Sequence, residues 1–210
     1  MNSRTEYLLM SGPAGLIEIA IDRPAIDAVQ RGTAVIAHPH PLFGGTMQNK
    51  VVGTLARAFV QSGWTAVRFN FRGVGKSEGV HDNGVGEAQD LLAVIDGHAP
   101  TGPLALAGFS FGGFVTASAV AQLHGRREPE KIILVGPATS RFPVPPVPAE
   151  LHPRTLVIHG EQDETVLLQA TLDWARPQFL PVTVIPGVEH FFHGQLNLLK
   201  SLTVRHLSQA

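Results

Sequence analysis

The stretch LALAGFSFGG, from Leu104 to Gly113, decides the fold of this chain. An apolar run that ends in Gly-x-Ser-x-Gly and continues into a helical pattern is typical of a sharp strand-to-helix turn. The glycines of such a turn are needed because a Cβ would collide with the neighbouring backbone. Ser110, at the apex, is then exposed for attack on a carbonyl, so the stretch predicts an acyl hydrolase with Ser110 as nucleophile.

A second Gly-x-Ser-x-Gly match runs from Gly75 to Gly79, with Ser77 at its centre. The residues that follow it, Val80–Gly84, read as a loop and not as a helix. The required context of strand, turn and helix is met only around Ser110, which is therefore preferred to Ser77.

The run Gly73-Val74-Gly75-Lys76-Ser77 also resembles the end of a phosphate-binding loop. The full pattern needs a glycine where Asn70 stands, and it needs a helix to open at the Lys-Ser pair. Neither condition is met, so we interpret the run as a glycine-rich turn at the rim of the site and not as a nucleotide site.

Bulk properties restrict the protein class. The chain has 210 residues, a formal net charge of −1 and no cysteine. The length predicts a single domain over residues 1–210, and the charge disfavours a nucleic-acid partner. The absence of cysteine excludes disulfides and thiolate chemistry. We expect no membrane association, because no apolar run approaches the ~20 residues of a span and no apolar signal core opens the chain. These features favour a cytoplasmic protein; none indicates an oligomeric state.

Short apolar β-rich runs alternate with helical patterns along the chain. We expect strands at 7–10, 16–21, 33–37, 65–71, 104–109, 131–135, 155–159 and 182–185. We expect helices at 51–61, 85–96, 113–124, 166–176 and 191–208. This alternation predicts an α/β fold: a mostly parallel, twisted sheet with an antiparallel start and helices on both faces.

A nucleophilic serine needs a histidine base, and the base needs an acid that fixes its tautomer. In the strand-elbow architecture these occur in the order Ser, acid, His, on loops after strands. Asp163 follows the expected strand 155–159, and His190 follows 182–185. Ser110, Asp163 and His190 are therefore the predicted catalytic residues.

Neighbouring residues offer alternatives to two of these assignments. His193 is the alternative base, at the start of the expected last helix. Glu161 and Glu164 flank Asp163. In a non-catalytic interpretation, all three acids only keep the loop solvated. His159, before a glycine turn, is expected to be structural.

The oxyanion hole needs two backbone N–H groups. One is expected from Phe111, the residue after the nucleophile. The other is expected from the loop His38–Gly45, whose prolines have no N–H to donate. His40 is the preferred donor and Leu42 the second choice; the alternative is a rigid turn without a catalytic part.

No cofactor or metal ion is expected. His38 and His40 are close together in sequence, but no third ligand occurs at a spacing that suits zinc.

The chain resembles the α/β-hydrolase superfamily, and in particular a small, cap-less bacterial group within it. The resemblance is carried by four stretches, His38–Met47, Arg68–Ser77, Gly108–Gly113 and Gly187–Gly194. It implies an α/β-hydrolase fold with Ser110, Asp163 and His190 as the triad, and esterase or thioesterase activity. Dienelactone hydrolases are similar in size but have a cysteine nucleophile, so their chemistry is not carried over.

Many relatives insert a helical cap after the sixth strand, whereas Gly136–Pro153 is a short, proline-rich segment. We therefore expect an open site that binds small acyl esters weakly. Phe43, Met47, Phe111 and Phe191 are the candidate pocket walls, with ordinary core packing as the alternative for each.

We thus predict a serine hydrolase for a small-molecule carboxylic ester or thioester. A peptidase or amidase on the same triad is the second hypothesis, and a non-catalytic binding module is the third. Within the proline-rich segment, residues 142–148 satisfy the P-x-x-P spacing of a polyproline ligand, but an ordered surface loop is preferred.

Overall fold

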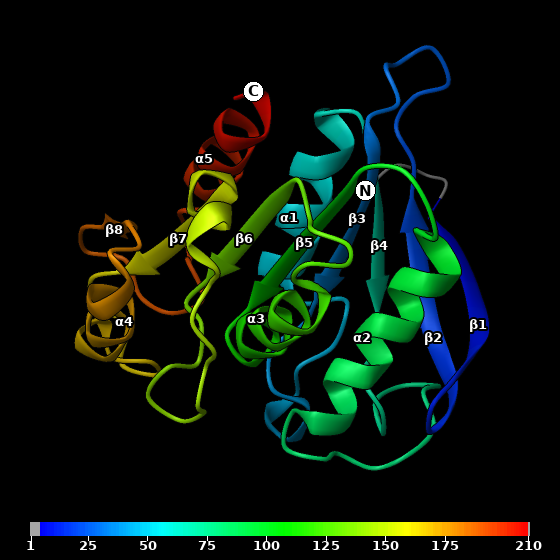
Figure 1. Ribbon diagram of the computed structural model, residues 1–210, viewed down its shortest axis with the longest axis horizontal. Helices are drawn as coiled ribbons and strands as arrows, with labels where there is room; N and C mark the ends of the chain where they lie inside the picture. Colours follow the sequence, from blue (N-terminus) through cyan, green and yellow to red (C-terminus); the bar gives the residue numbers. More distant parts are fainter. Residues whose placement is uncertain (1–4, 210) are drawn as a thin grey trace.

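The computed structural model describes residues 5–209, which form one eight-stranded sheet flanked by helices (Figure 1). The strand order is β1-β2-β4-β3-β5-β6-β7-β8. β2 pairs antiparallel with both β1 and β4, and every later pairing is parallel. The strands are β1 (Glu6–Gly12), β2 (Gly15–Asp22), β3 (Gly32–Ala37), β4 (Trp64–Phe69), β5 (Leu104–Phe109), β6 (Lys131–Val135), β7 (Thr155–Gly160) and β8 (Val182–Ile185). The predicted mostly parallel sheet with an antiparallel start is confirmed.

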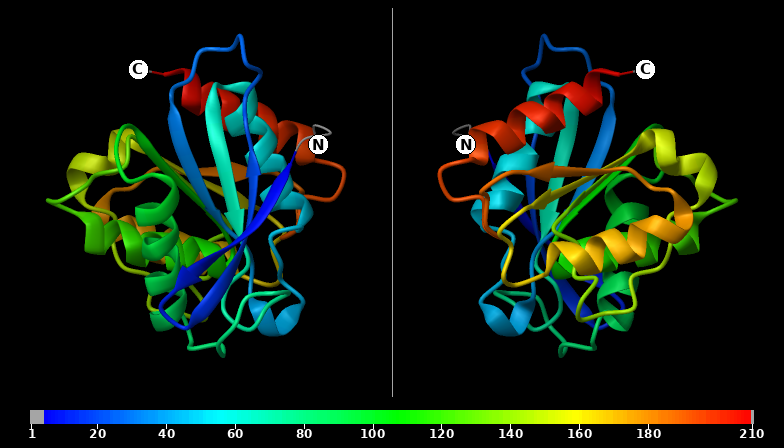
Figure 2. Two further views of the ribbon diagram at one scale, coloured as in Figure 1. Left: turned by 90° about the vertical axis from the view of Figure 1, so that its right-hand side faces the viewer. Right: turned by 90° about the vertical axis from the view of Figure 1, so that its left-hand side faces the viewer.

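Helices cover both faces of the sheet, as predicted (Figure 2). They are α1 (Lys50–Gln61), α2 (Val85–His98), α3 (Phe111–Leu123), α4 (Leu168–Ala175) and α5 (Leu196–Ser208). The apolar side chains of α1 and α5 share one buried cluster with one face of the strands. Those of α2, α3 and α4 belong to the cluster on the opposite face. Because both faces are covered, the central strands are buried at almost every position.

Most element boundaries differ from the prediction by one or two residues, and the start of the last helix by five. The strand expected at 65–71 ends at Phe69, and the helix expected from 113 already begins at Phe111. The last helix begins at Leu196 and not at 191, because the intervening residues form turns. Phe192 and Gly194 have left-handed φ angles of 56° and 74°, which a right-handed helix cannot include.

No cap covers the carboxyl edge of the parallel strands among the described residues. Between β6 and β7 the only helical element is a 3₁₀ helix, Ala149–Arg154. The proline-rich residues before it pack against α4 as an ordered loop. The Trp174 indole N–H donates to the carbonyl of Val144, and the Val147 N–H donates to the Gln178 side chain.

A buried histidine ties the exit of β3 to the exit of β4. His38 is fully buried, and its Nε2 accepts the Phe71 N–H at 3.0 Å. Its Nδ1 lies 2.6 Å from the Pro39 carbonyl oxygen, so the ring proton sits on Nδ1. Burial lowers the pKa of His38 to about 3, which keeps the ring neutral.

None of the helices in residues 5–209 combines the length and the apolar character needed to cross a membrane.

The apolar cluster between α1, α5 and the sheet predicts the effect of a core substitution on stability. Leu55 of α1 is completely buried, so Leu55→Ala removes apolar contacts and leaves a cavity. We expect the free energy of unfolding to fall by about 2–5 kcal/mol in urea titrations followed by circular dichroism. Leu198→Ala is the matched control, because Leu198 is 40% exposed on α5. Its effect should stay within about 0.5 kcal/mol; equal losses would contradict the described packing.

His38 predicts a pH dependence of stability. The pKa of this ring is about 3 in the folded protein and about 6.5 in the unfolded chain, so only the unfolded chain binds the proton between these pH values. Stability from this group is therefore complete above pH 6.5 and is lost as the pH falls towards 3, by about 1.4 kcal/mol per pH unit. We expect His38→Gln to reduce the slope of unfolding free energy against pH by about that amount between pH 6 and 4. An unchanged slope in urea titrations at these pH values would contradict a neutral buried ring.

Candidate active site

The turn between β5 and α3 holds Ser110 in a strained conformation. Its φ and ψ are 57° and −117°, values that an L-residue rarely adopts. A Cβ on Gly108 would collide with the backbone of Gly112, and one on Gly112 would collide with the Ala37 carbonyl. The Ser110 N–H donates to the Val135 carbonyl on the neighbouring strand at 2.9 Å, which fixes the turn against β6.

Three side chains distant in sequence meet at this turn. The Ser110 Oγ lies 3.0 Å from His190 Nε2, and His190 Nδ1 lies 2.5 Å from Asp163 Oδ2. All three residues are less than 10% exposed. Asp163 follows β7 and His190 follows β8, so each comes from a loop at the carboxyl edge of the sheet.

The Asp163 carboxylate is held at both oxygens. While Oδ2 faces His190, Oδ1 accepts the N–H groups of Thr165 at 2.9 Å and Val166 at 2.7 Å. Gly136, at the end of β6, lies directly beneath the pair. A Cβ on Gly136 would come within 3.3 Å of His190 Cε1 and 3.5 Å of Asp163 Oδ2. Backbone N–H groups thus orient the carboxylate independently of its contact with the imidazole.

Aromatic rings fix the orientation of the His190 ring. It packs against Phe109, with ring centroids 4.8 Å apart, and edge-on against Phe191 at 5.1 Å. The alternative base His193 is 70% exposed at its side chain, and its Nδ1 faces Glu189 at 3.1 Å. It lies in a turn and not on a helix, so the structure brings His190 and not His193 to Ser110.

The two alternatives to Asp163 are exposed and do not face His190. Glu161 is exposed and accepts the Gly187 N–H at 2.8 Å, and Glu164 is also exposed. His159 is fully buried, with Nε2 2.9 Å from the Val166 carbonyl oxygen and 3.4 Å from Asp163 Oδ2. Burial lowers the pKa of His159, so a neutral ring supports the loop that carries Asp163.

Two backbone N–H groups beside Ser110 have no acceptor within residues 5–209. They belong to Phe111, the first residue of α3, and to His40, in the loop after β3. The Leu42 N–H, by contrast, donates to His40 Nδ1 at 3.2 Å. The close approach of Gly112 to the Ala37 and His38 carbonyls brings the two segments together.

A cavity of about 160 Å³ opens beside Ser110. Its lining is mainly apolar and contains three phenylalanine side chains, one histidine and one arginine. The lining residues are His40, Phe43, Ser110, Phe111, Ala138, Arg141, Phe142, Thr165 and Val166. The sequence analysis named Phe43 and Phe111 but missed Arg141 and Phe142, although Phe142 opens the proline-rich stretch that it singled out.

Two predicted pocket walls lie outside this cavity. Met47 is 2% exposed, because the Asn70 side chain accepts its N–H and Arg68 donates to its carbonyl. These bonds draw it into the core. Phe191 packs on His190 and lines a separate hollow on the surface with His193.

The second Gly-x-Ser-x-Gly match has a structural role. The Ser77 hydroxyl donates to the Asn70 carbonyl and accepts the Glu18 N–H. Ser77 lies in a loop that precedes α2, and no helix begins at Lys76. The run therefore ties β2 to the exit of β4 and lacks the helix N-terminus of a phosphate site.

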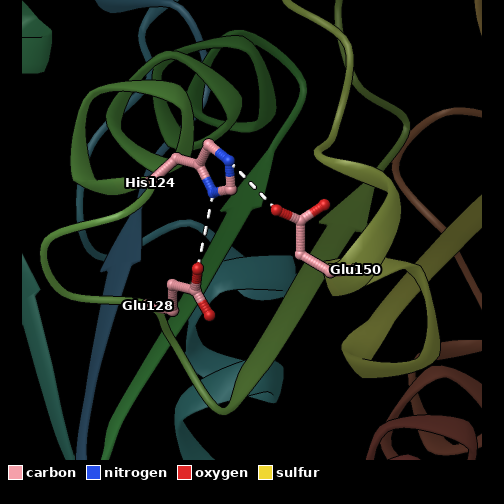
Figure 3. Close-up of side chains that lie close together, drawn as sticks. All are labelled: His124, Glu128 and Glu150. Carbon is pink, nitrogen blue, oxygen red and sulfur yellow. Dashed lines mark ion pairs between the residues drawn. The ribbon is translucent and has the colours of Figure 1, made fainter.

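One group of side chains in the described part of the chain is close enough to share a metal ion, and it does not include His38 or His40. Figure 3 shows His124 between Glu128 and Glu150. Its Nδ1 faces Glu128 at 3.5 Å and its Nε2 faces Glu150 at 3.0 Å. All three are exposed, at the end of α3 opposite to Ser110. The arrangement is that of a surface ion-pair bridge.

Comparisons with known proteins agree with this geometry. An α/β serine hydrolase without a lid from Xanthomonas campestris superposes with a TM-score of 0.87 and 39% identity, covering 99% of this chain and 95% of that one. A serine hydrolase homologue from Coxiella burnetii gives 0.84 and 40%, with 97% of each chain covered. An uncharacterized protein of Rickettsia prowazekii is 30% identical over 88% of this chain and 81% of its own length.

Residues 31–152, more than half of the chain, match the family model described as serine aminopeptidase, S33 (Hydrolase_4). The match spans β3 to the 3₁₀ helix before β7, and thus includes the turn at Ser110. The chain therefore belongs to this family, and it is a small α/β hydrolase without a cap.

Proposed function

We propose that the protein cleaves small carboxylic esters or thioesters through an acyl-enzyme on Ser110. The observation that carries the proposal is the continuous hydrogen-bond chain from Ser110 Oγ through His190 to Asp163 Oδ2. A serine held at a strained turn and bonded to an oriented imidazole has the arrangement that nucleophilic catalysis requires.

During the attack the proton moves only between Ser110 and His190, and Asp163 keeps its charge. Asp163 Oδ2 accepts the N–H of His190 Nδ1, which leaves the lone pair of Nε2 facing the serine hydroxyl. As Ser110 Oγ attacks the carbonyl carbon, Nε2 takes its proton, and Asp163 stabilises the imidazolium. The imidazolium then protonates the leaving alcohol or thiol, and His190 activates the water that releases the acid.

The oxyanion is assigned to the N–H groups of His40 and Phe111. Both lack a protein acceptor within the described residues, so neither must break a bond to donate. Leu42, the second candidate, already donates to His40 Nδ1 and is less suited. Two such preorganised donors stabilise a developing oxyanion more than water does.

The lining of the cavity favours an ester or thioester over the N-terminus of a peptide. An aminopeptidase must hold a free ammonium group near the scissile bond. None of the residues that line the cavity is acidic, and the only charged one is Arg141. Asp163 is buried and faces His190, so it offers no carboxylate to an ammonium group. The family description names an aminopeptidase, but the charge at this site opposes that activity.

The proposed nucleophile can be tested by labelling and by substitution. A fluorophosphonate should give a single adduct, on Ser110, in intact-mass and peptide-mapping experiments. Ser110→Ala should lose this adduct and reduce turnover of p-nitrophenyl acetate by about 10³-fold or more. Ser77→Ala is the matched control, because Ser77 is the centre of the second Gly-x-Ser-x-Gly match; it should keep both. Ester turnover by folded Ser110→Ala at the original rate would refute the proposal.

A second prediction concerns the acid. Asp163→Asn should lower kcat by about 10²- to 10⁴-fold, because an amide does not hold the imidazole tautomer or stabilise its charge. The downfield proton resonance of His190 Nδ1–H should disappear from the NMR spectrum of the variant. Glu161→Gln is the control from the same loop and should retain both activity and resonance. If Glu161→Gln were the damaging change, the assignment of Asp163 would be wrong.

A further inference from the structure

The cavity beside Ser110 has an uneven distribution of charge. Arg141 is the only lining residue with a full charge at neutral pH, and no lining residue carries a carboxylate. The Arg141 side chain is exposed and forms no ion pair or hydrogen bond within residues 5–209. Asp163 is buried, with His190 against its Oδ2 and two backbone N–H groups on Oδ1. Within the part of the chain that the structure describes, no carboxylate therefore pairs with this guanidinium.

The backbone that carries Arg141 is held in place. The N–H groups of Arg141 and Phe142 both donate to the Ala138 carbonyl, at 3.1 and 3.0 Å. The Phe142 ring stacks on Phe114, with centroids 4.9 Å apart and planes 14° from parallel, and contacts Phe111 at 5.1 Å. Anchoring of Phe142 thus fixes the backbone of the adjacent arginine, whose side chain lines the cavity.

His40 adds a second donor to the same cavity. Its Nδ1 accepts the Leu42 N–H, so the proton of the neutral ring is on Nε2. Burial lowers the pKa of His40, and the charges of His81 and Arg141 lower it further against the opposing effect of Glu87. Nε2 has no acceptor among the described residues. It is thus a free N–H donor in the ring that packs 4.8 Å from Phe43.

The volume limits the size of the occupant. The cavity is small, about 160 Å³, and suits a short arm better than a long acyl chain. Arginine recognises a carboxylate with two parallel N–H bonds, and an additional imidazole N–H suits the remaining lone pairs. Phe43, Phe111 and Phe142 provide walls for a short carbon arm.

We infer that this cavity is a subsite for a carboxylate carried by the substrate on a short arm, with Arg141 and His40 Nε2–H as its recognition groups. The inference rests on the proposed ester or thioester hydrolysis at Ser110 and specifies its substrate class. The substrate is an ester or thioester with an anionic end a few bonds from the scissile carbonyl, such as a half-ester of a short dicarboxylic acid.

The test compares esters that differ only in this charge. On the acyl side the pair is monomethyl glutarate and the methyl ester of glutaramic acid. On the leaving-group side the pair is 4-acetoxybenzoate and 4-acetoxybenzamide. Acid release in a pH-stat gives kcat/KM for each ester. The wild-type protein should prefer the anion in one pair, and that pair identifies the side on which the carboxylate binds.

Arg141→Gln should reduce this preference, the ratio of kcat/KM for the anion to that for the amide, by about tenfold or more. Arg141→Lys should retain part of it, because the charge remains without the bidentate geometry. Arg205→Gln is the matched control, since Arg205 is exposed on α5, away from the cavity. It should leave the ratio unchanged.

Free glutarate provides a readout that does not depend on turnover. It should slow the fluorophosphonate labelling of Ser110 in the wild-type protein, and less so in Arg141→Gln. Turnover of the neutral esters without any anion preference, or a preference that survives Arg141→Gln, overturns the subsite and leaves the proposed hydrolase intact. Failure of every ester and of labelling overturns both.

Discussion

The site depends on one constraint, the close backbone contact that the turn at Ser110 imposes. Gly108 and Gly112 have no Cβ, so the start of α3 approaches the end of β5 and the carbonyls after β3. The left-handed φ of Ser110 is tolerated because these contacts, and the bond from its N–H to Val135, hold it. Because the contacts at Gly108 and Gly112 and the bond to Val135 fix this residue, its hydroxyl needs no reorganisation at the moment of reaction.

The other parts of the site converge because parallel strands end at one edge of the sheet. β3, β5, β7 and β8 supply His40, Ser110, Asp163 and His190, respectively, from loops that are far apart in sequence. Polar contacts hold two of these loops. His38 lies beneath the loop that carries His40, and two backbone N–H groups hold the Asp163 carboxylate in the loop after β7. Neutral side chains and backbone groups thus position the proposed catalytic residues, so that the Asp163 carboxylate is free to face His190.

Without a cap, the loop between β6 and β7 takes over part of the enclosure. Its proline-rich residues pack on α4, while Phe142 stacks over Phe114 and closes one side of the cavity. The same loop places Arg141 at the rim. In the subsite that we propose, the Arg141 cation at the rim of a small apolar cavity gives this cap-less site a means to select its substrate by charge.

The sequence by itself determined the fold class, the order of the strands along the chain and the chain order of Ser110, Asp163 and His190, because periodicity and glycine-bounded turns are local signals. It did not determine the start of α5, where turns around Phe192 replace the expected helix. Only the tertiary structure decided that Met47 is buried in the core and that Arg141 lines the cavity. It also decided that the Leu42 N–H donates to His40 Nδ1. The physical reason is that these outcomes depend on how the folded chain packs around each side chain and N–H group, and sequence spacing does not specify this packing.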